Sequence, residues 1–285
     1  MIFSLLGFDL DRFVRDTLAE DLGEGLPGGG RDVTSESVIP ADARFSGVMD
    51  SRDAITVAGL PIAAAFLRAL DPGCEIEVLV GEGESVTAGT DLMRLSGKAR
   101  ALLTAERSAL NTVQHLSGIA TMTAKYVAAM HGHATLLDTR KTIPGLRHLE
   151  KYATRMGGAK NHRMGLWDAA MIKDNHVAVA GSVGEAVGRA VRAGVRDIIC
   201  EVDRLDQIEP ALHAGTTHLL LDNMGPDMLR EAVALVAGRV PCEASGGVNL
   251  DTIGAIAATG VDYVSVGRLT QSAPAADIGL DFQVL

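Results

Sequence analysis

The chain has 285 residues, of which 47% are apolar but only 4% aromatic, and it carries a formal net charge of −10. This length suits one large α/β domain or two smaller domains, with a core built mainly from Ala, Val, Leu and Ile. The acidic balance argues against a general nucleic-acid-binding surface, and no apolar run approaches the roughly 20 residues of a membrane-spanning helix.

The N-terminal residues and the cysteines favour a cytoplasmic protein. Residues 1–7 are apolar but lack the basic region and the small-residue cleavage site of a signal peptide. Cys74, Cys200 and Cys242 lie far apart and outside any Cys-x-x-Cys pair, so they predict neither a disulfide framework nor a zinc site. We expect reduced, buried thiols and no membrane or nucleic-acid partner.

The first hundred residues predict a small α+β layer. Their pattern indicates helices at 10–22 and 62–70. It indicates strands at 43–49, 74–79 and 91–95. The Gly-rich segment 23–30 contains Pro27 and has no strand before it. We therefore interpret it as a flexible connection and not as a phosphate-binding loop.

A long helix is predicted at 101–130, because Leu, Val and Ile recur there near helical spacing. Gly118 is expected to interrupt this helix. The segment carries Arg107, but the pattern alone does not distinguish Arg107 from an ordinary solvated side chain.

The C-terminal half predicts a repeated βα unit. Six short apolar runs indicate buried strands at 134–139, 169–173, 197–202, 218–222, 241–245 and 262–266. The amphipathic segments between them indicate helices at 182–193, 205–213, 226–237 and 250–258. Such units form a barrel or a doubly wound sheet, and the lack of a Gly-x-Gly-x-x-Gly or P-loop motif favours the barrel.

Polar residues or glycines follow each of these strands. In catalytic barrels the chemistry lies at the C-terminal ends of the strands, so these residues would share one mouth. They are Arg140, Lys141, Lys173, Glu201, Asp222, Ser245, Gly246 and Gly267. Segment 138–176 also carries eight Lys or Arg and four Asp or Glu, a pattern that fits either a focused anion site or a solvated helix face.

Several motifs resemble those of quinolinate phosphoribosyltransferases. The most specific are Asp138-Thr139-Arg140-Lys141-Thr142-Ile143-Pro144-Gly145, Asn161-His162-Arg163-Met164-Gly165 and Ile172-Lys173-Asp174-Asn175-His176. The resemblance extends upstream to Glu106-Arg107-Ser108 and downstream to Leu221-Asp222-Asn223-Met224 and Glu243-Ala244-Ser245-Gly246-Gly247, and so covers nearly the whole chain.

The resemblance implies a fold and an assembly. It implies an N-terminal α/β sandwich domain at 1–115, joined by the C-terminal tail 275–285, and an open, TIM-like α/β barrel at 116–274. It also implies a homodimer with shared active sites, which could assemble further.

Residue by residue, the resemblance implies a site for quinolinate and a site for phosphoribosyl pyrophosphate. The quinolinate site would comprise Arg107, reaching in from the partner subunit, with Thr139, Arg140, Lys141, His162, Arg163 and Lys173. The phosphoribosyl pyrophosphate site would comprise Lys141, Glu201, Asp222, Ser245, Gly246, Gly247, Val266, Gly267 and Arg268. Lys141, Glu201 and Asp222 would be catalytic, and Glu201 and Asp222 would hold Mg²⁺, directly or through water.

These residue types suit that chemistry. Arginines bind adjacent carboxylates through paired, charge-assisted hydrogen bonds, and Mg²⁺ on hard oxygen ligands neutralises a departing pyrophosphate. Ser245-Gly246-Gly247 at a strand end lets backbone N–H groups approach a phosphate, and we expect the N-terminus of the next helix to add favourable charge.

Two alternatives stay open at this point. One is the related protein of molybdenum-transport operons, which has the same fold but differs around the Thr-Arg-Lys and Lys-Asp-Asn-His motifs, both of which are intact here. The other is a non-catalytic ligand-binding barrel, which no feature of the sequence excludes.

Overall fold

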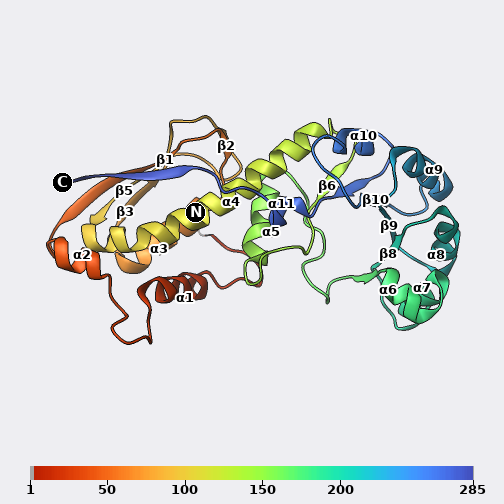
Figure 1. Ribbon diagram of the computed structural model, residues 1–285, viewed down its shortest axis with the longest axis horizontal. Coiled ribbons are helices and arrows are strands. Elements are labelled where there is room, and N and C mark those ends of the chain that lie inside the picture. Colours follow the sequence, from red (N-terminus) through yellow and green to blue (C-terminus); the bar gives the residue numbers. More distant parts are fainter. Residues whose placement is uncertain (1–2, 285) are drawn as a thin grey trace. The chain divides into compact units, whose positions relative to one another are not determined.

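The computed structural model describes residues 3–284 and divides into two compact units. One unit comprises the described residues up to Met122, His148–Gly157 and those from Ala273 onward, and the other comprises Thr123–Arg147 and Gly158–Ser272. Each unit has its own sheet (Figure 1). The predicted α/β class, with a small N-terminal sheet domain and a C-terminal parallel sheet, is confirmed.

The first unit contains an antiparallel sheet in the order β12-β1-β5-β3. Its strands are β1 (Arg44–Ser51), β3 (Glu75–Val78), β5 (Thr90–Lys98) and β12 (Ile278–Val284). Its helices are α1 (Leu10–Leu22), α2 (Val33–Val38), α3 (Leu60–Leu70) and α5 (Arg147–Met156), and β2 (Ile55–Thr56) pairs with β4 (Ser85–Val86). Since β12 pairs with β1, the C-terminal segment completes the N-terminal sheet.

Helix α4 (Ala99–Ala129) is continuous, so the predicted interruption at Gly118 is wrong. Gly118 has a different role in the packing of the first unit. A Cβ atom at this position would lie 2.0 Å from the carbonyl oxygen of Pro274. The glycine therefore allows the chain that leads to β12 to cross closely over the helix.

The second unit contains six parallel strands in the order β6-β11-β10-β9-β8-β7. They are β6 (Thr135–Leu137), β7 (Ala170–Ile172), β8 (Ile198–Val202), β9 (His218–Asp222), β10 (Cys242–Ser245) and β11 (Tyr263–Ser265). The first strand pairs with the last, as in a barrel, whereas β6 and β7 form the two ends of the strand order. The sheet is thus the open barrel that was expected.

Helices follow the strands of this unit, and α7, α8 and α9 lie along the outside of β8, β9 and β10 (Figure 1). The helices are α6 (Asp174–Ala180), α7 (Val183–Arg192), α8 (Ile208–Ala214), α9 (Pro226–Val236), α10 (Ile253–Ala257) and α11 (Arg268–Gln271), with a 3₁₀ turn η1 (Leu205–Gln207) before α8. Helices α6 and α8 end at Gly181 and Gly215, whose φ angles of 100° and 98° are those of a left-handed cap.

The register of the parallel strands brings their polar C-terminal residues to one edge. Asp222 on β9 pairs with Ser245 on β10, and Glu201 on β8 lies opposite Leu220 of β9. The preceding residues of β9, Leu219–Leu221, are buried, as in a parallel sheet covered on both faces. The sheet core therefore fixes the positions of the polar strand ends.

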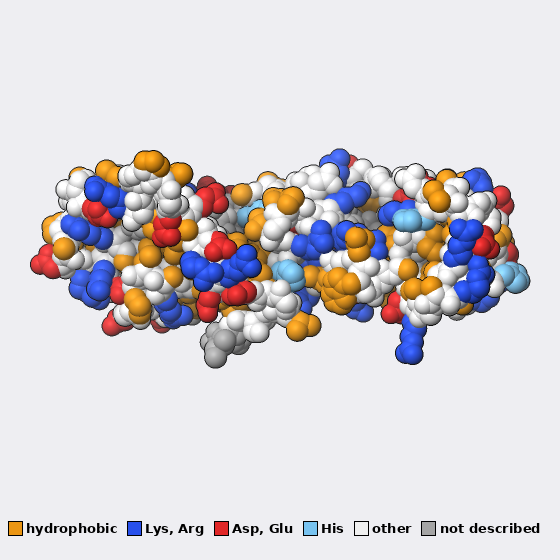
Figure 2. Space-filling view, turned by 90° about the horizontal axis from the view of Figure 1, so that it is seen from below, with side chains coloured by type: hydrophobic (Ala, Val, Ile, Leu, Met, Phe, Trp, Pro, Cys, Tyr) orange, Lys and Arg blue, Asp and Glu red, His pale blue; other side chains and the backbone are white. Residues whose placement is uncertain are grey.

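Among residues 3–284, every helix is too short or too polar to cross a membrane. On the face drawn in Figure 2, Lys and Arg side chains are interspersed with Asp and Glu. Cys74, Cys200 and Cys242 are buried and unpaired, as predicted.

We predict that Gly118→Ala lowers the free energy of unfolding by about 1–3 kcal/mol, because the new methyl group would overlap the Pro274 carbonyl. Thermal or urea unfolding measures the change. Gly184→Ala in α7 is the matched control, since its Cβ would meet no heavy atom closer than 3.6 Å. This control should stabilise the helix by about 0.5–1 kcal/mol. A Gly118→Ala protein as stable as the parent would contradict the close crossing.

Candidate active site

A cavity of about 720 Å³ lies at the C-terminal ends of β6–β11. All the predicted site residues except Arg107 line it: Thr139, Arg140, Lys141, His162, Arg163, Lys173, Glu201, Asp222, Ser245, Gly246, Gly247, Val266, Gly267 and Arg268. The cavity is also lined by residues that the sequence did not single out, among them Asn223, Glu243 and Ser265.

Two guanidinium groups dominate the basic side of the cavity. The Nε atoms of Arg140 and Arg163 are buried, and within the described residues neither has a hydrogen-bond partner. Burial and the neighbouring charge of Arg140 lower the pKa of Arg163. Buried donors without acceptors are costly, so this arrangement favours an anion that accepts from both arginines.

Hydrogen bonds hold the loop that carries Arg163 beside β6. Asp138, which is fully buried, accepts hydrogen bonds from the backbone N–H of His162 at 2.8 Å and from Nδ2 of Asn161 at 2.6 Å. Arg163 donates through Nη1 to the carbonyl of Ala169 at 2.9 Å. These contacts hold one edge of the guanidinium, while its buried Nε has no acceptor among the described residues.

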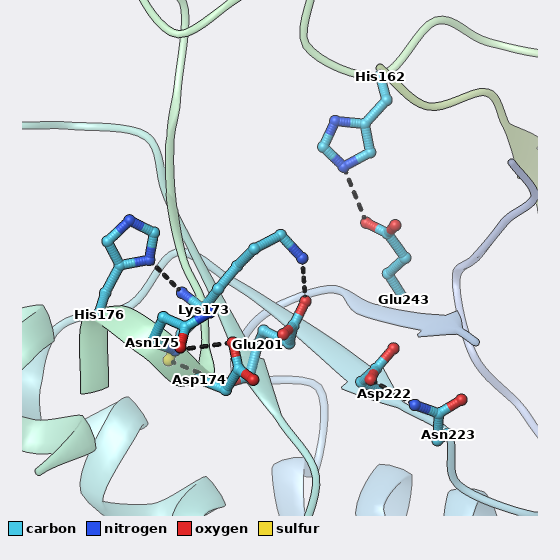
Figure 3. A network of polar contacts seen from close by, with 10 residues as sticks. His162, Lys173, Asp174, Asn175, His176, Glu201, Asp222, Asn223 and Glu243 are labelled. Atoms are coloured by element: carbon cyan, nitrogen blue, oxygen red, sulfur yellow. Dashed lines mark hydrogen bonds and ion pairs between the residues drawn. The ribbon is translucent and has the colours of Figure 1, made fainter. Parts of the chain in front are cut away.

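Carboxylates line the opposite side. Glu201 forms an ion pair with Lys173, so two residues assigned to different substrates are in direct contact (Figure 3). Burial and the charge of Glu201 raise the pKa of Asp222, although Lys173 and Lys141 partly offset this effect. Glu201 and Asp222 are therefore close enough to repel each other, and a cation between them would relieve that repulsion.

Asn223 orients Asp222 and was missed by the sequence analysis. Its Nδ2 donates to Oδ2 of Asp222 at 2.6 Å, and its backbone is left-handed, with a φ angle of 56° (Figure 3). A Cβ atom on Gly246 would lie 2.1 Å from Oδ1 of Asn223. Gly246 is thus required for the approach of β10 to the turn after β9, as well as for any contact with a phosphate.

Gly246 and Gly247 follow Ser245, the last residue of β10, and have φ angles of 90° and 62°. Glycine turns of this kind can present backbone N–H groups to an anion. Helix α10 begins only at Ile253, so the expectation that a helix N-terminus adds charge here is wrong. Across the cavity, a Cβ on Gly267 would lie 2.8 Å from Cδ of Lys141, and so Gly267 leaves space for that lysine.

Glu243 lies beneath the basic side and was also missed. Its side chain is fully buried, and its Oε2 lies 3.3 Å from Nε2 of His162 and 2.9 Å from Nε2 of His218. Burial alone would raise the pKa of Glu243, but contacts with His162, His218 and Ser265 outweigh burial and hold the pKa at about 2. Glu243 is therefore a carboxylate at neutral pH.

Arg107 does not line the cavity. It is an exposed residue of α4 and belongs to the first compact unit. Its predicted role depends on a second subunit and stays a prediction.

No group of three or more His, Cys, Asp or Glu side chains within residues 3–284 could hold a metal ion. Glu201 and Asp222 nevertheless present hard oxygen donors in the cavity. Such a pair fits Mg²⁺, which usually binds one or two carboxylates and takes its other ligands from water and substrate phosphates.

The chain is similar to known proteins over almost all of its length. Residues 32–117 match the model of the quinolinate phosphoribosyl transferase N-terminal domain, and residues 119–281 match that of the C-terminal domain. The nicotinate-nucleotide pyrophosphorylase (carboxylating) of Mycobacterium leprae is 44% identical, with 94% of this chain and 95% of that protein aligned. Quinolinate phosphoribosyltransferase (decarboxylating) 1b of Nicotiana tabacum is 38% identical, with 96% of this chain and 82% of that protein aligned.

Solved structures agree with these matches. The crystal structure of NadC from Streptococcus pyogenes has a TM-score of 0.93 and 36% identity, and the alignment covers 99% of both chains. The nicotinate-nucleotide pyrophosphorylase of Francisella tularensis has a TM-score of 0.89 and 38% identity, over 96% of both chains.

Proposed function

The chain belongs to the quinolinate phosphoribosyltransferase family, and from this premise we propose how its cavity binds the two substrates. The enzyme is a pentosyltransferase of NAD biosynthesis that converts quinolinate and phosphoribosyl pyrophosphate to nicotinate mononucleotide, pyrophosphate and CO2. The two alternatives are not favoured, because relatives over nearly the full length are named for this activity.

Quinolinate binds on the basic side of the cavity. The buried Nε atoms of Arg140 and Arg163, which have no hydrogen-bond partner among the described residues, support this assignment most strongly. Quinolinate carries two adjacent carboxylates, and two guanidinium groups can bind them through charge-assisted hydrogen bonds. Lys173 lies at the border with the acidic side, and Thr139, Lys141 and His162 complete the pocket.

Phosphoribosyl pyrophosphate binds across the acidic side. Glu201 and Asp222 accept hydrogen bonds from the ribose hydroxyls, and the backbone N–H groups of the glycine turn after β10 bind the 5′-phosphate. Val266, Gly267 and Arg268 border the same end of the cavity, and Lys141 lies between the two substrates. Mg²⁺ held by Glu201 and Asp222, directly or through water, would neutralise charge on the departing pyrophosphate.

In this arrangement the residues bring the ring nitrogen of quinolinate to C1 of the ribose. A C–N bond forms as the bond from C1 to the pyrophosphate oxygen breaks, and the ring becomes a pyridinium. The positive ring then stabilises the electron pair that remains on C2 when the 2-carboxylate leaves as CO2, and a proton takes its place. Arg140, Arg163 and Lys173 orient the carboxylates, and Lys141 stabilises the leaving phosphate oxygens.

We place this reaction in the cytoplasm and in a homodimer. The unpaired, buried cysteines support a reducing compartment. The dimer is supported by Arg107, which is exposed on α4 and lies outside the set of residues that line the cavity.

Arg140→Ala should lower kcat/KM for quinolinate at least tenfold while the protein stays folded. One charge-assisted hydrogen bond is worth about 1.5–3 kcal/mol, which corresponds to this loss or more. Steady-state kinetics and circular dichroism measure the two properties. Lys160→Ala is the control, because Lys160 is an exposed cation of the same segment that does not line the cavity. Near-normal kcat/KM in a folded Arg140→Ala enzyme would refute the assignment.

Activity should require Mg²⁺ or Mn²⁺, and Asp222→Asn should suppress turnover more than it weakens quinolinate binding, since Asp222 acts on the phosphoribosyl side. Turnover in excess EDTA and calorimetric titration with quinolinate measure these effects. Asp203→Asn, an exposed carboxylate just beyond β8, is the charge-matched control. Full activity in EDTA would show that the metal proposal is wrong.

Mixing inactive Arg107→Ala with inactive Lys173→Ala should restore activity if Arg107 reaches the partner's site. A mixed dimer then has one site with both defects and one with neither, so roughly a quarter of all sites are intact after random exchange. Native mass spectrometry verifies that mixed dimers form. If they form and the mixture remains inactive, the shared-site proposal fails.

A further inference from the structure

Glu243 occupies an unusual position for a carboxylate. It lies in the middle of β10, paired with Leu220 of β9 and Tyr263 of β11, and its side chain has no solvent exposure although it borders the cavity. A buried charge requires compensating partners. Within residues 3–284 it forms no ion pair with Lys or Arg, and its polar contacts are with His162, His218 and Ser265.

The backbone determines which nitrogen of His162 carries the proton. The N–H of Arg163 donates to Nδ1 of His162 at 2.7 Å, so Nδ1 must present a lone pair. The proton of the neutral ring is therefore on Nε2, which faces Glu243 at 3.3 Å (Figure 3). A proton on Nδ1 would point at the N–H of Arg163, so this contact disfavours protonation of Nδ1.

His218 is the second imidazole that contacts Glu243. Its Nε2 lies 2.9 Å from the same oxygen of Glu243, and its ring stacks on Tyr263 with 5.6 Å between the ring centroids. His218 does not line the cavity, whereas His162 does. Glu243 thus lies between a histidine that lines the cavity and a histidine that does not.

We propose that Glu243 is a positioning residue, which fixes His162 as the neutral tautomer protonated on Nε2 and, through Nδ1 of that ring, fixes the backbone of Arg163. Arg140, Arg163 and Lys173 then face the dicarboxylate, and His162 presents a ring of fixed orientation to the substrate. This inference rests on the proposed quinolinate site, because it assigns the role of His162 within that site.

The first test needs no change at Glu243. Protein labelled with ¹⁵N-histidine is studied by NMR, and the His162 signals are identified by their loss in His162→Gln. We expect an unprotonated Nδ1 and a protonated Nε2 at neutral pH. A protonated Nδ1 in the native protein overturns the proposal directly, whether or not the enzyme turns over quinolinate. Failure of the proposed function would instead appear as no turnover with a normal His162 spectrum.

The second test compares Glu243→Gln with His218→Gln. Both imidazoles face Oε2 of Glu243, and glutamine removes the negative charge there. Nε2 of His162 then faces a weaker carbonyl acceptor or, in the other orientation of the amide, an N–H₂ donor. We expect protonation of His162 to move toward Nδ1 and kcat/KM for quinolinate to fall roughly 10- to 100-fold, with a smaller change in KM for phosphoribosyl pyrophosphate.

His218→Gln is the matched control, because it alters the same buried cluster but leaves the contact between Glu243 and His162. It should keep the His162 tautomer and most of the activity. If Glu243 only stabilises the fold, both variants lower the unfolding temperature and neither changes the His162 spectrum or the KM for quinolinate. That outcome overturns the proposal.

Discussion

The site depends on the guanidinium groups of Arg140 and Arg163, whose buried Nε atoms have no hydrogen-bond acceptor within the described residues. Arg140 and Arg163 repel each other, and this repulsion adds to the effect of burial in lowering the pKa of Arg163. Such a pair destabilises the ligand-free protein, and a dianion relieves both the repulsion and the missing hydrogen bonds. If the proposed quinolinate site is right, the fold therefore preorganises these two groups for the dicarboxylate before the substrate binds.

The parallel sheet makes this preparation possible. The register between its apolar strands is fixed, so the sheet itself brings the residues at the C-terminal strand ends together. Asp138 accepts a hydrogen bond that holds the loop of Arg163 beside β6, and Asn223 donates one to Asp222 next to the glycine turn after β10. The basic and acidic sides meet at the ion pair of Lys173 and Glu201, and in the proposed arrangement the two substrates meet there.

The sequence predicted the strands of the barrel and the residues at their ends, because buried parallel strands are apolar and the polar residue that follows each one is conspicuous. It could not predict the role of Gly118, since the carbonyl that requires a glycine there belongs to Pro274, far along the chain. Glu243 was missed because a single acidic residue inside a short strand gives no sign of the histidines that compensate it. Asn223 was missed because its left-handed backbone is visible only in three dimensions.

The most direct test of the account is the release of labelled CO2 from quinolinate that carries the label in its 2-carboxylate. The purified protein is supplied with phosphoribosyl pyrophosphate and Mg²⁺, and nicotinate mononucleotide and pyrophosphate are measured in the same samples. The account predicts equal amounts of CO2, nicotinate mononucleotide and pyrophosphate, and no release without phosphoribosyl pyrophosphate. Quinolinate that stays intact with active, folded protein and both co-reactants present would contradict it.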